Sequence, residues 1–379
     1  LFHAGSDRQN DIGFPTTCND LFTGFITFGD SLAVDNDSNF VRTALIMPET
    51  SNQDNRAVAL NGVMAHEFGH QLGLVDLYST NNFMSMLGDF ALMDNNGFGS
   101  GIDFEFPVGS VFGAIPVYPM AWSRAFLGFV DVVDFRQGTD IEIVAAEMIS
   151  DGIKVARVPI TEYEYYLIEN RAIDIDGRPA AAIADEVTSV IQGPVNFDRE
   201  YNREYDFLLP GSGLLIFHVD ERVAALDYNY DGESNFHDNQ LQWAYDIYGN
   251  PVDQFITLVE ADGIVNFGGI YRAGYGSEDD MFRDDRADAF TPNTNPPTID
   301  NTGNNSHIFI TDITRATDAS VDPPVLVDTA LSFNVATDRM ADGFPVRAGI
   351  PPLDLSPIAD DLDGDGNPEI IFASNDLLC

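Results

Sequence analysis

The sequence predicts an α+β protein in which a helix-bearing region is followed by a longer β-rich region. Up to about residue 135, strand-like runs alternate with one clear amphipathic helix. From about residue 140 to 335 the pattern changes to short alternating segments separated by Gly, Pro, Asn and Asp, which is typical of strands and turns. The chain has 379 residues, more than the roughly 250–300 that one hydrophobic core organises, so we expect more than one unit.

Strand-like runs at residues 22–28 and 43–47 open the first region, and the main helix is expected over residues 60–72. An apolar stripe recurs every four residues along that helix and predicts the side that packs inward: Leu60, Met64, Phe68 and Leu72. Asn61 is the expected N-cap, and Gly73 can take the left-handed conformation that ends a helix.

A second, short helix is expected over residues 119–127, and the β-rich region follows it. Strands are predicted in the segments EYEYYLIENR, GLLIFHVDE and QFITLVEADG. The tail carries IADDLDGDGNPEIIFAS, a carboxylate loop followed by a strand. We therefore expect three parts, at residues 1–135, 136–340 and 341–379.

The charge of the chain excludes two classes of partner. Lys and Arg total 18 against 61 Asp and Glu, a formal net charge of -43, which repels nucleic-acid backbones and anionic lipid. No apolar stretch approaches the ~18 residues that span a bilayer, so no transmembrane segment is expected. The acidity fits a strongly solvated, salt-adapted surface and also carboxylates that hold hard cations such as calcium.

The segment HEFGHQLGLVD lies on the main helix and spaces two histidines by four residues. Positions i and i+4 share a helix face, so the imidazoles of His66 and His70 can point at one ion. Glu67 lies beside them and suits a general base that acts on a zinc-activated water. This face lies about 200° round the helix from the apolar stripe, so we expect it to line a cleft. The alternative is a pair of ordinary core or surface histidines.

Asp76 can complete the metal site, because Gly73 allows the chain to turn sharply and return to the ion. A fourth position would then stay open for water. A downstream carboxylate, Asp94 or Glu105, is the alternative third ligand, in which case Asp76 caps a loop. In FALMDNNG, Met93 resembles the methionine turn of metzincin-type peptidases, where the side chain forms an apolar floor beneath the metal. The alternative is an ordinary core methionine.

These motifs, in their order along the chain, resemble those of a known family. The segments HEFGHQLGLVDLY, ALMD, PMAWSRAFLGFV, EYYLIENR, GLLIFHVDE and LVEADG resemble the M6 family of secreted metallopeptidases, the immune inhibitor A group, over about residues 1–315. The resemblance implies a zincin- or metzincin-like catalytic domain with Glu67 as the catalytic base and these zinc ligands: His66, His70 and Asp76. It also implies a secreted or cell-surface endopeptidase, whose signal peptide is not in this chain. One departure is Val75, where the family pattern favours proline.

Two acidic loops predict calcium sites. In DYNYDGESNFHD, with Gly232 sixth, oxygen-bearing side chains fall at the spacing of an EF-hand-type loop: Asp227, Asn229, Asp231 and Asp238. A solvated Asn/Asp turn is the alternative. In DLDGDGNPE, ligands are expected at positions 1, 3, 5 and 9: Asp361, Asp363, Asp365 and Glu369. A plain acidic turn is the alternative there, and the tail resembles the first segment of an FG-GAP or VCBS-type β-propeller repeat.

The sequence therefore predicts a secreted, calcium-stabilised zinc endopeptidase that acts on protein or peptide substrates. In the expected mechanism, zinc polarises water and the scissile carbonyl, and Glu67 carries the proton to the departing amine. An extended substrate would pair with the strand at residues 43–47, and His218 is either an oxyanion donor or a hydrogen-bonded strand histidine. Two alternatives are a non-catalytic, calcium-binding adhesion or binding protein on a peptidase scaffold, and a zinc hydrolase of non-peptide amides or esters. The sequence does not give the oligomeric state.

Overall fold

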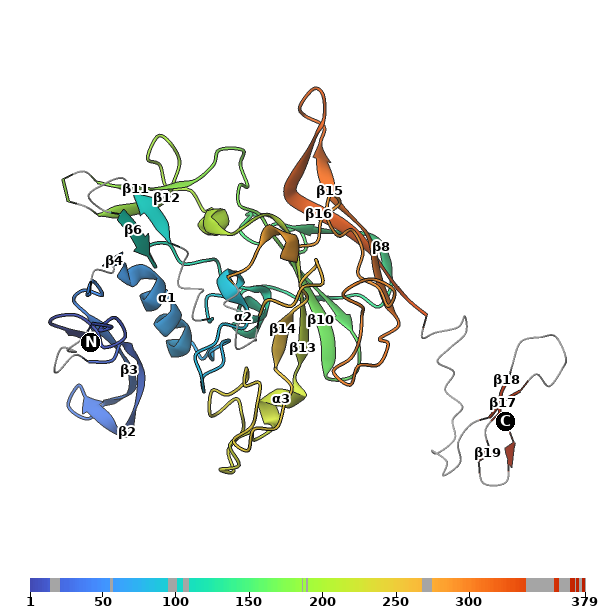
Figure 1. Ribbon diagram of the computed structural model, residues 1–379, viewed down its shortest axis with the longest axis horizontal. Helices are drawn as coiled ribbons and strands as arrows, with labels where there is room; N and C mark the ends of the chain where they lie inside the picture. Colours follow the sequence, from blue (N-terminus) through green and yellow to red (C-terminus); the bar gives the residue numbers. More distant parts are fainter. Residues whose placement is uncertain are drawn as a thin grey trace. The chain divides into compact units, whose positions relative to one another are not determined.

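The structure is a computed structural model in which the chain forms two compact units, residues 1–337 and 338–379 (Figure 1). It describes residues 1–13, 21–54, 57–94, 101–104, 109–185, 187–188, 190–267 and 275–338, and beyond them only the backbone of short strands. Strands dominate the regular structure and the helices are short, which confirms the β-rich character. Over these residues, no helix combines the length and the apolar character needed to cross a membrane.

The second unit contains two short antiparallel strand pairs: β17 (Ile358–Asp360) with β18 (Glu369–Ile371), and β19 (Ala373–Ser374) with β20 (Leu377–Leu378). The first pair flanks the carboxylate loop of the tail. Three expected calcium ligands, Asp361, Asp363 and Asp365, lie outside the described residues. Of Glu369 only the backbone is described, at the start of β18. The calcium site and the propeller repeat therefore stay predictions.

A three-stranded sheet in the order β1–β3–β2 lies beside the main helix (Figure 1): β1 Phe2–His3, β2 Gly24–Val34 and β3 Asn39–Pro48. The expectation that residues 43–47 offer a free edge to substrate is wrong, because β3 is the central strand. Residues 24–27 of β2 pair with it on one side. On the other side, Leu1 bonds the backbone of Leu45 and Met47. The edge strand of this sheet next to the helix is β2.

A second three-stranded sheet, in the order β4–β6–β5, leads into the main helix: β4 Ala57–Val58, β5 Ile102–Phe104, β6 Gly109–Phe112 and α1 Leu60–Gln71. The N-cap of α1 is Ala59, whose side chain makes no capping bond. The segment after β6 supplies an acceptor for the first turn of the helix instead, since the Gly62 N–H donates to the Gly113 carbonyl at 2.8 Å. The expected cap, Asn61, is wrong, because its side chain donates to the carbonyl of Ala114.

α1 turns its apolar stripe outward, which corrects the predicted orientation. Three members of the stripe are exposed by 41%, 51% and 43%: Met64, Phe68 and Leu72. The buried side carries two glycines and two polar residues: Gly62, His66, Glu67 and Gly69. A Cβ on Gly69 would lie 2.6 Å from the sulfur of Met93, so glycine lets the neighbouring loop close onto this side. The histidine face of the helix is thus the packed one.

The five-stranded sheet has the order β14–β13–β10–β9–β7: β7 Val133–Asp134, β9 Val155–Pro159, β10 Glu164–Arg171, β13 Gly213–Asp220 and β14 Ile256–Leu258. Both of its faces are buried, and alternate residues serve different cores. Leu167 and Phe217 belong to the core that also contains Met93. Ile168 and Ile216 belong to the core on the other face. The strands predicted in EYEYYLIENR, GLLIFHVDE and QFITLVEADG are confirmed as β10, β13 and β14.

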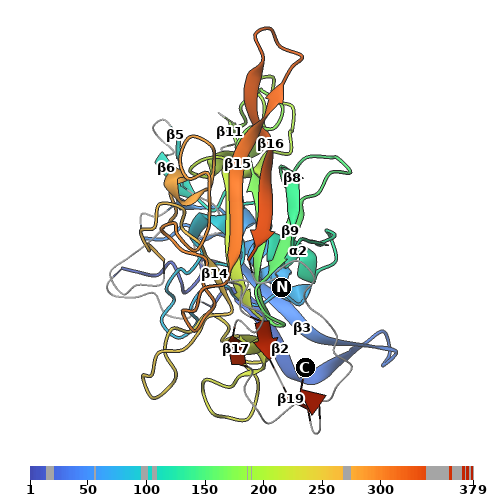
Figure 2. The same ribbon diagram turned by 90° about the vertical axis from the view of Figure 1, so that its right-hand side faces the viewer.

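A three-stranded sheet in the order β15–β16–β8 supplies the second core, and Figure 2 shows these strands side by side: β8 Gly138–Val144, β15 Ile308–Asp318 and β16 Val325–Thr337. A separate strand pair consists of β11 Ala181–Ala184 and β12 Ile191–Val195. The remaining α-helices are α2 Ala121–Phe126, inside the predicted range, and α3 Arg222–Ala225. Short 3₁₀ turns lie at Gly88–Phe90, Tyr205–Leu208 and Glu278–Asp280.

Charged side chains are buried where β10 meets α2. Arg171 is fully buried, and its guanidinium bonds both carboxylate oxygens of Asp206. It also bonds Glu169, whose other oxygen accepts from Arg124 at 2.6 Å. Backbone carbonyls accept further guanidinium hydrogens. We call these four side chains the Arg171 network, and within it the arginines balance the carboxylates.

Candidate metal centre

α1 places two imidazoles one helical turn apart, with ring centres separated by 4.8 Å. The Nδ1 atom of each ring lies 2.9 Å from a backbone carbonyl, that of Leu92 for His66 and that of Leu74 for His70. A carbonyl can only accept, so we assign the Nδ1–H tautomer to both rings. Each Nε2 then carries a lone pair, the form in which histidine binds a metal.

Gly73 turns the chain back toward these rings. It takes the left-handed conformation with φ +103°, and its N–H donates to the His70 carbonyl at 3.0 Å. The next N–H, of Leu74, donates to the Gly69 carbonyl, which completes a Schellman ending of the helix. After this turn, Asp76 Oδ1 lies 3.1 Å from the Nε2 atom of His66 and 3.2 Å from that of His70.

Three acceptor atoms therefore converge at one point. Asp76 Oδ1 is buried and accepts no hydrogen bond from the described part of the chain. With Nδ1 protonated on both rings, neither Nε2 has a hydrogen to donate, so the arrangement requires a positive charge from a metal ion or from added protons. Ligand atoms about 2.0–2.1 Å from a tetrahedral zinc ion are about 3.3 Å apart, close to the separations at this site. The donor set of two imidazoles and one carboxylate fits zinc.

The pKa values reflect the same demand for positive charge. Burial opposes ionisation of the Asp76 carboxyl, but the imidazoles of His66 and His70, when protonated, outweigh it and lower the pKa of Asp76. Burial also acts to lower the pKa of His70, yet the facing carboxylate of Asp76 outweighs that effect and raises it. Both shifts favour a cation beside Asp76.

Glu67 lies on the wall of a cleft of about 1070 Å³ that also contains His66. This volume is slightly above the roughly 300–1,000 Å³ typical of ligand pockets. Burial raises the pKa of Glu67, against the lowering effects of the two histidines and of a hydrogen bond with the Phe25 backbone. Other residues that line the cleft include Tyr78, Asp89, Phe112 and Tyr275. A carboxylate therefore borders the open space next to the converging atoms.

Met93 is fully buried and packs against the helix between the two histidines. Its sulfur lies beside Gly69, and its carbonyl accepts the Leu77 N–H at 2.8 Å. Both interpretations of this residue describe its position, since it belongs to a hydrophobic core and also underlies the histidine face.

The other carboxylates considered as a third ligand are placed differently. Asp94 is buried, and its Oδ2 accepts the backbone N–H groups of Met86 and Leu87, both at 2.7 Å. Its carboxylate thus holds the loop that carries Met93. Glu105 lies outside the described residues. Of the candidates described, Asp76 is the one that joins the two histidines within 4.8 Å.

Two residues at the site lie outside the motifs recognised in the sequence. Tyr78 stacks near His66 with ring centres 6.4 Å apart, and burial followed by the Asp76 charge raises the pKa of its hydroxyl. Asn239 bonds Asp76 from 163 positions away along the chain. Tyr78 is signalled only by its closeness to Asp76 in sequence, and nothing local signals Asn239.

No family model, curated protein or solved structure matches this chain. The family suggested by the motifs is therefore a proposal, and the site stands on its geometry.

The loop at residues 227–238 has its own pattern of bonds. Asp227 accepts the N–H groups of Tyr230 and Gly232, and Gly232 takes φ +97°. The Asn229 amide donates to Asp231 and Asp238, both at 3.1 Å. These bonds occupy the side chains expected to bind calcium, and that assignment stays a prediction.

A further acidic group forms where sequence reasoning placed none. Asp174, Asp176 and Glu204 bring carboxylate oxygens within 4.8 Å of one another. Asp176 is paired with Arg178 at 2.7 Å, and Glu204 accepts the Ile175 N–H at 2.7 Å. Asp174 accepts two backbone N–H groups of its own turn, so protein donors serve all three carboxylates.

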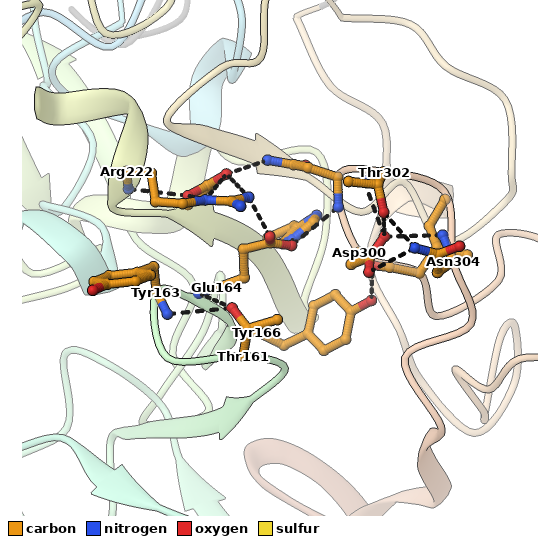
Figure 3. A network of polar contacts seen from close by, with 12 residues as sticks. Thr161, Tyr163, Glu164, Tyr166, Arg222, Asp300, Thr302 and Asn304 are labelled. Atoms are coloured by element: carbon orange, nitrogen blue, oxygen red, sulfur yellow. Dashed lines mark hydrogen bonds and ion pairs between the residues drawn. The ribbon is translucent and has the colours of Figure 1, made fainter. Parts of the chain in front are cut away.

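His218 lies on β13, outside the residues that line the cleft. Its Nε2 is 3.4 Å from Glu164, which also bonds Arg222 and the Asn301 N–H. Figure 3 shows Glu164 in this network, between Arg222 and the turn of Asp300. His218 therefore lies on a strand, as the second interpretation predicts, but its Nε2 makes no hydrogen bond within the described structure.

Proposed function

We propose that this chain is a zinc-dependent endopeptidase in which Glu67 is the general base and three residues hold the metal: His66, His70 and Asp76. The observation that carries the proposal is the convergence of their ligand atoms, where both Nε2 atoms lie 3.1–3.2 Å from the buried Oδ1 of Asp76. Glu67 follows the first histidine in sequence and borders an adjoining cleft. The order of the motifs, which resembles that of the M6 metallopeptidases, supports the same function.

Zinc, when bound, acts as a Lewis acid on water and on a substrate carbonyl. The part of the chain in this chemistry is to move a proton. The Glu67 carboxylate accepts the proton of the attacking water and donates it to the departing amine nitrogen. The two backbone carbonyls that accept from Nδ1 hold the imidazoles of His66 and His70 in one orientation during this transfer.

An extended substrate finds its pairing partner in β2 rather than in β3. The start of β2 is an edge in the described part of the sheet, and the Phe25 backbone reaches Glu67. Phe22 and Thr23, just before this strand, line the cleft. A peptide bonded to this edge would cross the cleft beside Glu67, as in strand addition to a sheet.

The wider architecture is part of the same proposal. The region around α1 would be a zincin- or metzincin-like catalytic domain, followed by a β-rich companion. The tail would be the first segment of an FG-GAP or VCBS-type propeller that binds calcium. The M6 resemblance supports secretion, and the net charge of -43 supports a role for calcium as counter-ion.

Hydrolysis of casein by the zinc-loaded protein tests the proposal. We expect a chelator to abolish hydrolysis and added zinc to restore it. Glu67→Gln should lower kcat by about 10²–10⁴-fold, the usual contribution of a general base, while zinc affinity changes little. Glu142→Gln, the same substitution at an exposed position of β8, is the matched control and should retain full activity.

The outcomes separate the competing functions. Full activity of Glu67→Gln would remove Glu67 from the chemistry. Zinc binding without cleavage of casein or of small amides and esters would favour the adhesion or binding scaffold. Cleavage confined to small non-peptide substrates would favour the alternative zinc hydrolase.

A further inference from the structure

The candidate metal centre receives a bond from a residue distant in sequence. Asn239 Oδ1 accepts the backbone N–H of Asp76 at 2.7 Å, and Asn239 Nδ2 donates to Asp76 Oδ2. One amide therefore holds both the main chain and the side chain of the carboxylate. Asn239 belongs to the segment that follows α3, whereas Asp76 follows α1.

These bonds determine which carboxylate oxygen faces the histidines. Asp76 Oδ2 is engaged by the amide, so Oδ1 is the oxygen turned toward the two Nε2 atoms. A carboxylate rotates easily about its χ2 angle when nothing holds it. Partners that orient a metal ligand in this way typically contribute about 10–100-fold to metal affinity.

Asn239 is itself held firmly. Its backbone takes φ +57°, a left-handed conformation that asparagine tolerates better than most residues. Its carbonyl accepts the Thr80 hydroxyl at 2.9 Å, and Trp243 Nε1 donates to the same hydroxyl at 2.9 Å. The loop after Asp76 and the segment at 239–243 are thus bonded to each other at several points.

We propose that Asn239 is a positioning residue of the metal centre, which orients Asp76 and thereby sets its affinity for a divalent metal. The inference rests on the proposed function, since it takes His66, His70 and Asp76 as metal ligands. Because Asn239 directly follows Asp238, the acidic loop at 227–238 is tied to the metal centre through the same amide.

Zinc affinity, measured by competition with a chromophoric chelator on the full chain, tests the inference without recourse to catalysis. Asn239→Gly accepts φ +57° without strain and removes only the amide, so affinity should fall about 10–100-fold. Asn239→Asp keeps an acceptor for the Asp76 N–H but sets a carboxylate against Asp76 Oδ2, so affinity should fall at least as far. Cobalt(II) absorption spectra should change in both variants, because the ligand geometry changes.

Asn36→Gly is the matched control. Asn36 also takes a left-handed conformation, with φ +53°, and is exposed in the turn between β2 and β3. Its zinc affinity should stay within about 3-fold of the parent, well below the effect of losing a ligand-orienting partner. Thermal unfolding of the metal-free proteins shows whether each variant keeps its fold.

Unchanged zinc affinity in Asn239→Gly, or an equal loss in Asn36→Gly, would overturn the positioning role. A parent protein that binds zinc tightly but cleaves no peptide would remove the peptidase activity and leave the role of Asn239 intact. A parent protein that binds no divalent metal would overturn both.

Discussion

Two clusters of buried ionisable groups in the first unit differ in how their charges are met. In the Arg171 network, Arg124 and Arg171 face Glu169 and Asp206 across bonds of 2.5–3.2 Å. In the candidate metal centre, Asp76 Oδ1 faces two nitrogens that have no hydrogen to donate. The network contains its own cations, whereas the described part of the metal centre contains no arginine or lysine beside Asp76 Oδ1.

This difference shows which buried clusters indicate a ligand. Ionisable groups inside a protein are tolerated when they are paired and hydrogen-bonded, and an unmatched one destabilises the fold by several kcal/mol. The Arg171 network is complete and needs no further explanation than its place between β10 and α2. The metal centre is incomplete without a positive charge, so an ion is inferred there and not at the network.

Arg171→Met would leave the Arg171 network short of positive charge, as the metal centre is without an ion. Asp206 and Glu169 would then lie in the core without their main cation. Removal of one partner from a buried ion pair typically destabilises by about 3–5 kcal/mol, and we expect a loss in that range, the largest among these predictions. Urea unfolding, followed by circular dichroism at pH 7, measures it.

A double variant identifies the cause of that loss. Arg171→Met combined with Asp206→Asn removes a charge from each side, and it should recover part of the stability lost in the single variant. If the double variant is less stable than Arg171→Met alone, the stability loss comes from packing around the arginine stem. The unpaired charge would then not explain it, and the network could not be compared with the metal centre on that basis.

Local patterns in the sequence were sufficient for the parts of the molecule that depend on neighbours along the chain. Alternation of apolar residues predicts β10 and β13, and the four-residue spacing of His66 and His70 predicts their shared face. The left-handed turn at Gly73 follows from the lack of a Cβ. These features need no knowledge of what packs against them.

Features that depend on distant partners were missed or reversed. The exposure of Phe68 reverses the predicted orientation of α1, because Gly69 admits Met93 on the opposite side of the helix. β3 has two strand partners, and one of them comes from the start of the chain. Asn239 reaches Asp76 across 163 positions. Close packing at glycine and long-range hydrogen bonds leave no periodic signal in the sequence.

Glu147 lies beside the Arg171 network, and its ionisation should make the stability of the protein depend on pH. Its Oε1 accepts the Tyr205 N–H at 2.9 Å, while its buried Oε2 has no partner in the described structure. Burial, and then the charge of Asp206, raise the pKa of Glu147 to about 9, against the opposing effect of Arg171. The carboxyl therefore stays protonated in the folded protein at neutral pH.

The effect on stability follows from proton linkage. Between the unfolded pKa near 4.5 and the folded value, the folded state holds one proton more, so stability falls as pH rises through this window. Glu147→Gln removes the proton and keeps an acceptor for Tyr205. We expect equal stability at pH 4 and a gain of about 1–3 kcal/mol in the variant at pH 7–8, measured by urea unfolding across pH. Parallel stability curves for the two proteins would show that Glu147 does not titrate in this window.

Arg157→Met isolates burial as the variable, and its effect should be the smallest. Arg157 bonds both oxygens of Asp134, as Arg171 bonds both of Asp206, but the Arg157 and Asp134 side chains are 38% and 52% exposed. Water solvates either partner after the other is removed, so the same substitution should destabilise by less than about 1 kcal/mol. High salt should shrink even this difference, because the exposed pair is screened. A loss as large as that of Arg171→Met would mean that bidentate geometry, and not burial without a counter-charge, determines how much an ion pair stabilises the fold. The inference of an ion from the unmatched acceptors at Asp76 would then have no physical basis.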